Sequence, residues 1–216
     1  MALRRAALAL ILACAAQAAF AQFFVAWTKS PTIGVVANGD DPRIALVDEA
    51  VKFWNDTLAG LGSGFRLGPV TRVDQPIPEG DLDSLSQAAL GNYGPRGIRV
   101  PDSLRRGPGD LTLYLAHTEF VSFAGPFDDG RRVVGIRGLQ FPPLTLPNVA
   151  RNVIAHEIGH AIGLSHNVDP ALLMCGRPAP CRPGAFRSFE PRMFPLSAEE
   201  KRQLLSMYPP DWKPTR

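Results

Sequence analysis

The sequence predicts one α+β domain in which short strands alternate with amphipathic helices. A length of 216 residues suits a single domain, and the 45% hydrophobic content is enough for a packed core. Pro and Gly are both abundant, with 21 and 20 residues, which indicates long loops between short regular elements. No internal repeat is visible in the chain, so a repeat architecture is not expected.

The first half of the chain contains two predicted strands, one long helix and one brief helix. Residues 32–37 form a short β-branched run that ends at a turn, and residues 65–73 are the next strand candidate. Between them, hydrophobic residues recur at spacings of three and four after Pro42, as in a helix packed on one face. Residues 82–90 show a shorter helical pattern. The stripe of the long helix consists of Ile44, Val47, Ala50, Val51, Trp54 and Leu58.

The second half contains two further strand candidates and two helices. Leucines alternate with other residues over 110–117, which predicts a half-buried strand. Residues 132–138 form a shorter candidate, whose Gly and Arg residues indicate an irregular strand at a sheet edge. A long helix is predicted over 147–163. A last helix begins after Ser197, a suitable N-cap with Glu200 at the capping-box position.

The N-terminus has the composition of a signal peptide covering residues 1–21. A basic start precedes an apolar run over 6–16 that is too short to span a bilayer, and small residues follow at 19–21. Cleavage before Gln22 would release a secreted or periplasmic product. The alternatives are a buried N-terminal helix, or a lipid anchor at Cys14, where the preceding residues match the lipidation box imperfectly.

The charge of the chain gives no indication of nucleic-acid binding. The full chain has a formal net charge of +3, but Arg4 and Arg5 leave with the signal peptide and no acidic residue does. The mature domain is therefore close to neutral, whereas nucleic-acid binding favours a concentrated basic face. No later segment is long and apolar enough to cross a membrane, so no stable membrane insertion is expected after signal removal.

One short segment contains three of the four histidines of the chain. His156 and His160 are four residues apart, so on a helix they lie on one face and can bind one ion together. Gly163 is where the helix can end in a left-handed turn, which would bring His166 back toward the same ion. These residues predict a metal site with three imidazole ligands.

The donor set indicates a catalytic zinc site and not a structural one. Three neutral imidazoles leave the fourth coordination position open for water, whereas four protein ligands close a structural site. Glu157 lies one step round the helix, where it can reach a zinc-bound water without ligating the metal, and it is the candidate general base. The alternative is a relative that binds metal without turnover, and the presence of Glu157 argues against it.

Two cysteines remain in the mature domain and lie six residues apart. Because an exported protein meets an oxidising compartment, a disulfide between Cys175 and Cys181 is the first interpretation. The alternative is a thiolate ligand for a metal. It is the weaker interpretation, because three histidines already supply the protein ligands of a catalytic zinc.

The segment 156–166 matches the extended motif H-E-x-x-H-x-x-G-x-x-H, and on that basis the chain resembles the metzincin zinc peptidases. Met174, eight residues past the motif, stands where that family has its Met-turn, an apolar floor below the imidazoles. Within the family the chain is most similar to the matrixins, whose Met-turn and last helix resemble residues 167–174 and 196–209. The specific part of this resemblance covers about residues 148–208.

The resemblance implies a metzincin fold and hydrolysis of internal peptide bonds for the mature domain, residues 22–216. An upper lobe, about 22–163, would contain a twisted, mostly parallel sheet with an antiparallel edge strand and two helices. A small lower lobe, about 164–216, would contain the Met-turn, the disulfide loop and the last helix. A protein or peptide substrate would lie extended along the edge strand, for which residues 132–141 are the candidate.

The chain departs from the matrixin pattern at several positions. Only His117 lies outside the zinc motif, so a second, structural zinc is not expected. Asp128 and Asp129 are candidate calcium ligands, although two adjacent acids are more typical of a solvated turn. Gly176 stands where astacins and serralysins have a tyrosine partner of the zinc, and Asn167 differs from the residue common in matrixins. The cysteine switch of the matrixin propeptide has no counterpart before the motif, so latency by that route is not expected.

Two other functions remain open on the same scaffold. An exopeptidase, or an amidase acting on cell-wall peptides, would need a deep pocket that captures a free terminus. A zinc-bearing binding protein would hold the metal without turnover. Cleavage of an unstructured protein distinguishes these functions, because internal cuts indicate an endopeptidase and trimming from one end indicates an exopeptidase.

Overall fold

The computed structural model describes residues 25–90, 100–126, 129–176, 181 and 183–215. The predicted signal peptide, its cleavage before Gln22 and the alternative anchor at Cys14 lie outside the described residues. Asp128, one of the two candidate calcium ligands, also lies outside them. Across the described ranges, none of the helices is both long enough and apolar enough to cross a bilayer.

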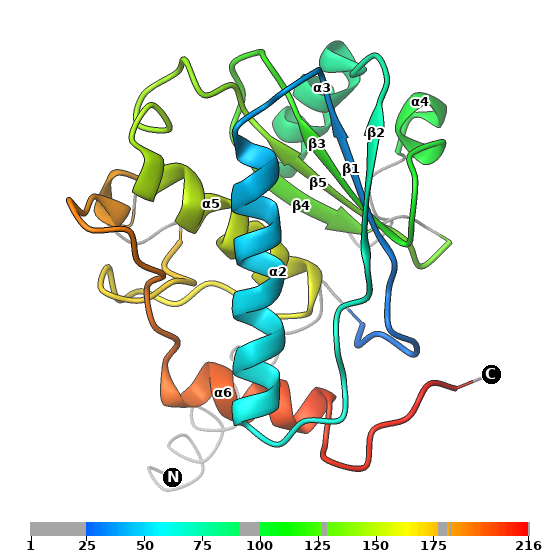
Figure 1. Ribbon diagram of the computed structural model, residues 1–216, viewed down its shortest axis with the longest axis vertical. Helices are drawn as coiled ribbons and strands as arrows, with labels where there is room; N and C mark the ends of the chain where they lie inside the picture. Colours follow the sequence, from blue (N-terminus) through cyan, green and yellow to red (C-terminus); the bar gives the residue numbers. More distant parts are fainter. Residues whose placement is uncertain (1–24, 91–99, 127–128, 177–180, 182, 216) are drawn as a thin grey trace, which may run out of the picture.

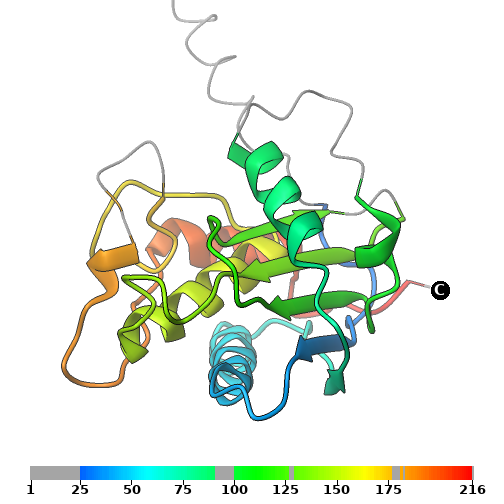
Figure 2. The same ribbon diagram turned by 90° about the horizontal axis from the view of Figure 1, so that it is seen from above.

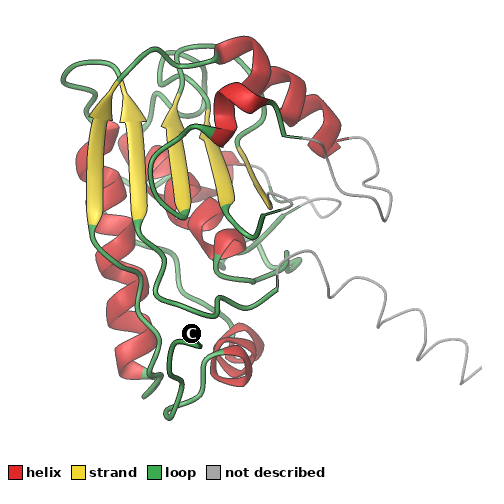
Figure 3. Cartoon of the chain, turned by 90° about the vertical axis from the view of Figure 1, so that its right-hand side faces the viewer, coloured by secondary structure: helices red, strands yellow, loops and turns green. Residues whose placement is uncertain are grey.

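A five-stranded sheet forms the centre of the molecule, with strand order β2-β1-β3-β5-β4 (Figures 1 and 3). Strands β2, β1, β3 and β5 run parallel, and β4 pairs antiparallel with β5 at one edge. This arrangement agrees with the mostly parallel sheet and antiparallel edge expected from the sequence. The strands are β1 Ile33–Ala37, β2 Val70–Asp74, β3 Leu111–Leu115, β4 Phe123–Pro126 and β5 Arg132–Ile136.

Helices cover both faces of this sheet (Figure 2). Helices α2 Arg43–Gly60 and α5 Pro147–Ala161 pack against one face and against each other. Helices α3 Glu79–Leu90 and α4 Asp102–Arg105 lie over the other face. Strand β3 is therefore buried on both sides, and the prediction of a half-buried strand was wrong there. Its second face is covered because Tyr114 packs under α4 and donates a hydrogen bond to the carbonyl of Leu104, at 3.0 Å.

The predicted edge strand over 132–141 is an interior strand, and the edge is formed by β4 instead. Arg132 gave the appearance of an exposed position, but its guanidinium is buried. It donates hydrogen bonds to the carbonyls of Ala161 and Val25 and lies 4.1 Å from the ring centroid of Trp27. The edge strand was not predicted because its four residues, FAGP, include Gly and Pro and show no alternation.

The strand predicted over 65–73 is shorter than expected and begins at Val70. The preceding residues do not join the sheet because a side chain of α2 takes up the backbone hydrogen bonds that a strand would need. Asn55 accepts a hydrogen bond from the backbone N–H of Leu67, at 2.8 Å, and donates one to its carbonyl, at 3.1 Å. Phe65 stacks instead on Tyr208, with ring centroids 4.1 Å apart.

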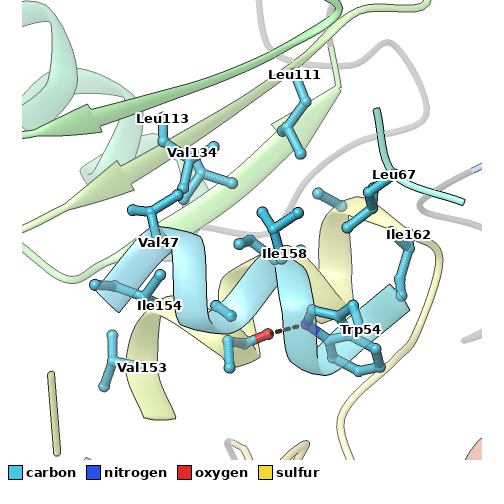
Figure 4. Close-up of a cluster of buried hydrophobic side chains, with 14 of the residues drawn as sticks. Val47, Trp54, Leu67, Leu111, Leu113, Val134, Val153, Ile154, Ile158 and Ile162 are labelled. Carbon is cyan, nitrogen blue, oxygen red and sulfur yellow. Dashed lines mark hydrogen bonds between the residues drawn. The ribbon is translucent and has the colours of Figure 1, made fainter. Parts of the chain in front are cut away.

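The packing of α2 on α5 forms the centre of the larger core (Figure 4). The predicted stripe on α2 is confirmed, since Val47, Trp54 and Leu58 are fully buried. Trp54 also donates from Nε1 to the carbonyl of Ala155 on α5, at 2.9 Å. Loss of a side chain of this size from a core typically costs about 3–5 kcal/mol, so this contact fixes the position of α5 firmly.

The last helix, α6 Ala198–Met207, begins with the predicted capping box. The Ser197 hydroxyl accepts from the Glu200 backbone N–H at 3.1 Å, and the Glu200 carboxylate accepts from the Ser197 N–H at 2.7 Å. A short 3-10 turn, η2 Pro183–Phe186, lies in the loop before it.

The first described residues pack against the C-terminal ends of α5 and α6. Trp27 donates from its backbone N–H to the hydroxyl of Tyr208, at 3.2 Å, and from Nε1 to the carbonyl of Ala161, at 2.9 Å. Tyr208 in turn donates to the carbonyl of Ile162, at 2.8 Å. The N-terminal segment and the last helix are thus joined to each other and to the C-terminal end of α5.

Candidate metal centre

Helix α5 is anchored by two buried asparagines that also hold the loop before α6. Asn148 donates to the carbonyl of Phe186 at 2.9 Å and accepts from the backbone N–H of Arg192 at 2.9 Å. Asn152 donates to the carbonyl of Arg192 at 2.9 Å and accepts from the N–H of Phe194 at 2.8 Å. From the sequence these residues were predicted only to lie in a helix over 147–163, and the roles of both asparagines were missed because their partners lie about 40 residues away.

The helix ends in a turn that changes the direction of the chain at Gly163, as predicted. This glycine has a φ of 109°, in the region that favours glycine. Its N–H bonds the carbonyl of His160 at 2.9 Å, and the N–H of Leu164 bonds the carbonyl of Gly159 at 3.0 Å. These two bonds are those of a Schellman motif, which satisfies the last carbonyls of the helix and redirects the chain.

The three histidines of the motif converge on one point. The Nε2 atoms of His156 and His160 are 3.0 Å apart, and the Nε2 atom of His166 lies 3.2 Å from the first and 2.9 Å from the second. Among the described residues, they form the one group of three or more His, Cys, Asp or Glu side chains that could hold a metal ion. His156 is buried, His160 half-buried and His166 exposed, so the site opens on one side.

Backbone carbonyls fix which nitrogen of two rings faces the centre. His156 contacts the carbonyl of Leu173 through Nδ1, and His160 contacts the carbonyl of Leu164 through Nδ1, both at 2.7 Å. A carbonyl only accepts, so each Nδ1 is the protonated nitrogen and each Nε2 presents a lone pair. Two lone pairs facing each other at 3.0 Å repel unless a cation lies between them. This observation is the strongest indication of a metal site.

The donor set fits zinc. In a tetrahedral zinc site with Zn–N distances of about 2.1 Å, ligand nitrogens are about 3.4 Å apart, close to the spacing of the three Nε2 atoms. Burial, together with the neighbouring histidines, lowers the pKa of His156 to about 4 and that of His160 well below its ordinary value. These imidazoles are therefore neutral at neutral pH, as metal ligation requires.

Glu157 follows the first histidine on α5 and is buried, with 7% of its surface exposed. Within the described part of the chain, no hydrogen bond to its carboxylate is formed. Burial raises the pKa of this carboxyl group to about 8 in the metal-free protein. A divalent cation beside it would stabilise the ionised form and lower this pKa, so the group is suited to exchange a proton near neutrality.

Met174 lies directly under the metal-site helix. It is fully buried, and a Cβ atom on Gly159 would lie 2.5 Å from its sulfur and 2.8 Å from a ring carbon of Trp54. Gly159 therefore gives Met174 and Trp54 their close approach to the helix between the two histidines. No role for this glycine was predicted from the sequence, although a glycine in the interior of a predicted helix is a signal of close packing.

The chain after Met174 packs on the third histidine. The backbone of Gly176 lies so close to the imidazole of His166 that a Cβ atom there would overlap the ring. Next to it, Cys175 and Cys181 form a disulfide with their Cα atoms 5.5 Å apart. Glycine at 176 is thus needed for His166 to occupy its place.

The remaining candidate ligands lie elsewhere. His117 is exposed just past the end of β3, and its backbone N–H bonds the carboxylate of Glu79 at 2.8 Å. Asp129 forms an ion pair with Arg131 at 2.9 Å, so its carboxylate already has a cationic partner. Among the described residues, neither gives an indication of a second metal site.

Several solved structures resemble this chain at low sequence identity. Archaemetzincin from Methanopyrus kandleri aligns with 82% of this chain and 93% of its own, at 19% identity and a TM-score of 0.48. A zinc-dependent peptidase from Methanocorpusculum labreanum covers 80% of this chain and 99% of its own, at 15% identity and 0.38. Myroilysin covers 86% of each chain, at 13% identity and 0.41. No family model and no curated protein sequence matches this chain.

Proposed function

We propose that this protein is a zinc-dependent endopeptidase that holds one catalytic zinc through His156, His160 and His166. The observation that supports this proposal most directly is the convergence of three Nε2 atoms within 3.2 Å, two of them with tautomers fixed by backbone carbonyls. The open side of the site leaves room for a water and a substrate carbonyl, which a structural zinc site does not provide.

Glu157 is the general base in this proposal. Bound zinc would supply a Lewis acid that polarises the scissile carbonyl and lowers the pKa of a water molecule toward neutrality. The Glu157 carboxylate accepts a proton from the water molecule while the oxygen of that water forms a bond to the carbon of the scissile peptide. When the C–N bond breaks, Glu157 delivers this proton to the leaving amine, which balances the reaction.

The free edge of β4 is the proposed binding site for an extended peptide, in place of the residues 132–141 first expected. Among the described strands β4 pairs only with β5, so its outer edge is open to strand addition. Helix α5 packs against β4, which brings the edge close to the histidines. Ser86 fixes the entrance to the strand, because its hydroxyl donates to the carbonyl of Val121 at 2.8 Å and accepts from its N–H at 3.0 Å.

We further assign the protein to the metzincin type, with a matrixin-like active site. The motif over 156–166 supports this assignment, as does the buried Met174 beneath it, which we interpret as a Met-turn. In this assignment residues 22–163 form the upper lobe and residues 164–216 the lower lobe. Calcium has no part in the proposal.

Export of the protein is the localisation that we propose, either to a periplasm or out of the cell. The signal-like composition of residues 1–21 supports export. The disulfide between Cys175 and Cys181 also fits an oxidising compartment, because cytosolic proteins rarely keep one.

The deciding experiment uses residues 22–216, their bound metal and the cleavage of casein. We expect one zinc per chain and internal cuts, with cleavage abolished by a chelator and by Glu157→Ala while zinc stays bound. Trimming from one end of the substrate would replace this proposal with an exopeptidase. Bound zinc without cleavage of any protein or peptide would replace it with a binding protein, and absence of bound zinc would overturn the metal site itself.

A further inference from the structure

Asn167, the residue after the third histidine, has a partner for each kind of polar atom that it offers. Its backbone N–H donates to the carbonyl of Met174 at 2.8 Å, and its carbonyl accepts from the N–H of Gly176 at 3.1 Å. Its side-chain Oδ1 accepts from the N–H of Asp169 at 2.8 Å, and its Nδ2 donates to Glu200 Oε1 at 2.5 Å. The position of Asn167 is therefore determined from several directions at once.

The Glu200 carboxylate connects this turn to the start of α6. Glu200 is buried, with 4% of its surface exposed, and its two oxygens serve different donors. Oε2 accepts from the backbone N–H of Ser197 and completes the capping box, whereas Oε1 accepts from Asn167. The N-terminus of α6 also favours a negative charge at this place, because backbone N–H groups point toward it.

The amide of Asn167 has only one orientation that satisfies both of its side-chain partners. The carboxylate of Glu200 accepts and does not donate, so the NH₂ group must face it, and the backbone N–H of Asp169 requires the amide oxygen. Exchange of the amide oxygen and nitrogen would break both bonds. Carboxylate and amide thus form a directional pair.

His166 depends on this pair through its neighbours in the turn. The backbone bonds of Asn167 fix its distance from Gly176, and Gly176 packs directly against the imidazole of His166. A displacement of Asn167 would therefore move both the chain that bears His166 and the backbone that supports its ring. His156 and His160 do not depend on this turn in the same way, because both are on α5.

We propose that Asn167 and Glu200 are positioning residues that hold His166 at the metal. The proposal rests on the proposed zinc site, and it adds that the first turn of α6 sets the position of the third ligand. Groups that orient metal ligands without touching the metal typically change metal affinity by about 10- to 100-fold when they are removed.

A polarity exchange tests the pair. Asn167→Asp places a second carboxylate against Glu200, and Glu200→Gln places an amide NH₂ against a donor at either Ser197 or Asn167. In the double variant the new Gln donates to the new Asp and accepts from the Ser197 N–H, so every bond is restored. We expect each single variant to bind zinc about 10-fold more weakly or worse, and the double variant to recover most of this loss.

The measurements use the metal alone. A zinc dissociation constant is obtained by competition with a chromophoric chelator, and the visible absorption of Co(II) reports the geometry of the ligand set. Asn167→Ala, which adds no charge, is a second route should Asn167→Asp not fold, and it should change the Co(II) spectrum in the same direction.

Ser197→Ala is the matched control. It removes the other half of the capping box and lowers the melting temperature, but leaves the bond between Glu200 and Asn167 in place. We expect its Co(II) spectrum and zinc affinity to equal those of the wild type. Unchanged zinc affinity in Asn167→Asp, or no recovery in the double variant, would overturn the positioning role. A wild-type protein that binds neither metal would overturn the zinc site first, and would be recognised from that protein alone.

Discussion

The two halves of the candidate metal centre are built in different ways. His156 and His160 come from one buried helix, so their spacing along the chain places them on one face of it, and the carbonyls of Leu173 and Leu164 orient their rings. His166 is exposed and comes from a turn that depends on Gly163, Gly176 and a residue of α6. The spacing of the two helical ligands therefore comes from local geometry, whereas the position of His166 relative to them depends on contacts between segments distant in the sequence.

The first prediction concerns removal of a ligand from each half. His156→Ala and His166→Ala should both abolish tight zinc binding, because two imidazoles remain. In the metal-free protein, however, His156→Ala leaves the buried carbonyl of Leu173 without its donor and should lower the free energy of unfolding by about 1–3 kcal/mol. His166→Ala should change it by no more than about 0.5 kcal/mol, as is usual at exposed positions.

Chemical denaturation of the two metal-free variants, with zinc binding measured separately, checks this difference. Equal losses of stability would show that the turn is as much a part of the core as the helix, and would contradict the distinction.

The second prediction compares one glycine from each half. Gly159→Ala should lower the free energy of unfolding by about 1–3 kcal/mol, because the new methyl group overlaps Met174 and Trp54. The higher helix propensity of alanine offsets about 1 kcal/mol of this loss. Gly176→Ala should change the stability of the metal-free protein little but weaken zinc binding by about 10-fold or more, because it displaces the imidazole of His166.

Gly80→Ala is the control for both variants, because its added Cβ would meet no atom within 4 Å apart from the neighbouring backbone of its own helix. It should leave zinc affinity at the wild-type value and raise the free energy of unfolding by at most about 1 kcal/mol, because Gly80 lies in the first turn of α3. Loss of zinc binding in Gly159→Ala with its stability intact would reverse the expected roles.

The third prediction is a pH dependence that comes from the buried half. The pKa of His156 is lowered to about 4, so below its ordinary value of 6.5 the unfolded chain takes up a proton that the folded protein does not, and stability falls as the pH falls. The pKa of Glu157 is raised from 4.5 to about 8, so its contribution to stability is lost as the pH rises through 8. The stability of the metal-free protein should therefore decline on both sides, as the pH falls well below 6.5 and as it rises toward 8.

Urea unfolding of the metal-free protein across this range, beside Glu157→Gln, provides the measurement. The variant should lose the decline on the alkaline side and keep the one on the acid side. Parallel profiles for the two proteins would show that Glu157 is not buried in the way described here.

Features that depend on neighbouring residues were predicted from the sequence, and features that depend on distant residues were not. The stripe on α2, the capping box at Ser197 and the positive φ at Gly163 follow from spacing and local backbone chemistry. Edge strand β4 was missed because its pairing comes from β5, and β5 was misplaced because the partners of Arg132 lie 29 and 107 residues away.

The same limit applies within the metal centre. Spacing alone grouped His156 with His160 and located the turn toward His166. The hydrogen bond from Asn167 to the second carboxylate oxygen of Glu200 was not predicted, because the two residues are 33 positions apart and no local pattern connects them. Glu200 was predicted only as the capping-box residue of the last helix, and that role gave no reason to expect a second partner.

The contact between Trp27 and Tyr208 limits how early in synthesis the domain can finish folding. The two residues are 181 positions apart, so a chain that emerges N-terminus first holds Trp27 without its partner until almost the whole sequence has followed. Ala161 and Ile162, at the end of the metal-site helix, bond these same two side chains. The contacts that join the N-terminal segment to this helix end are therefore complete only once Tyr208 has been synthesised.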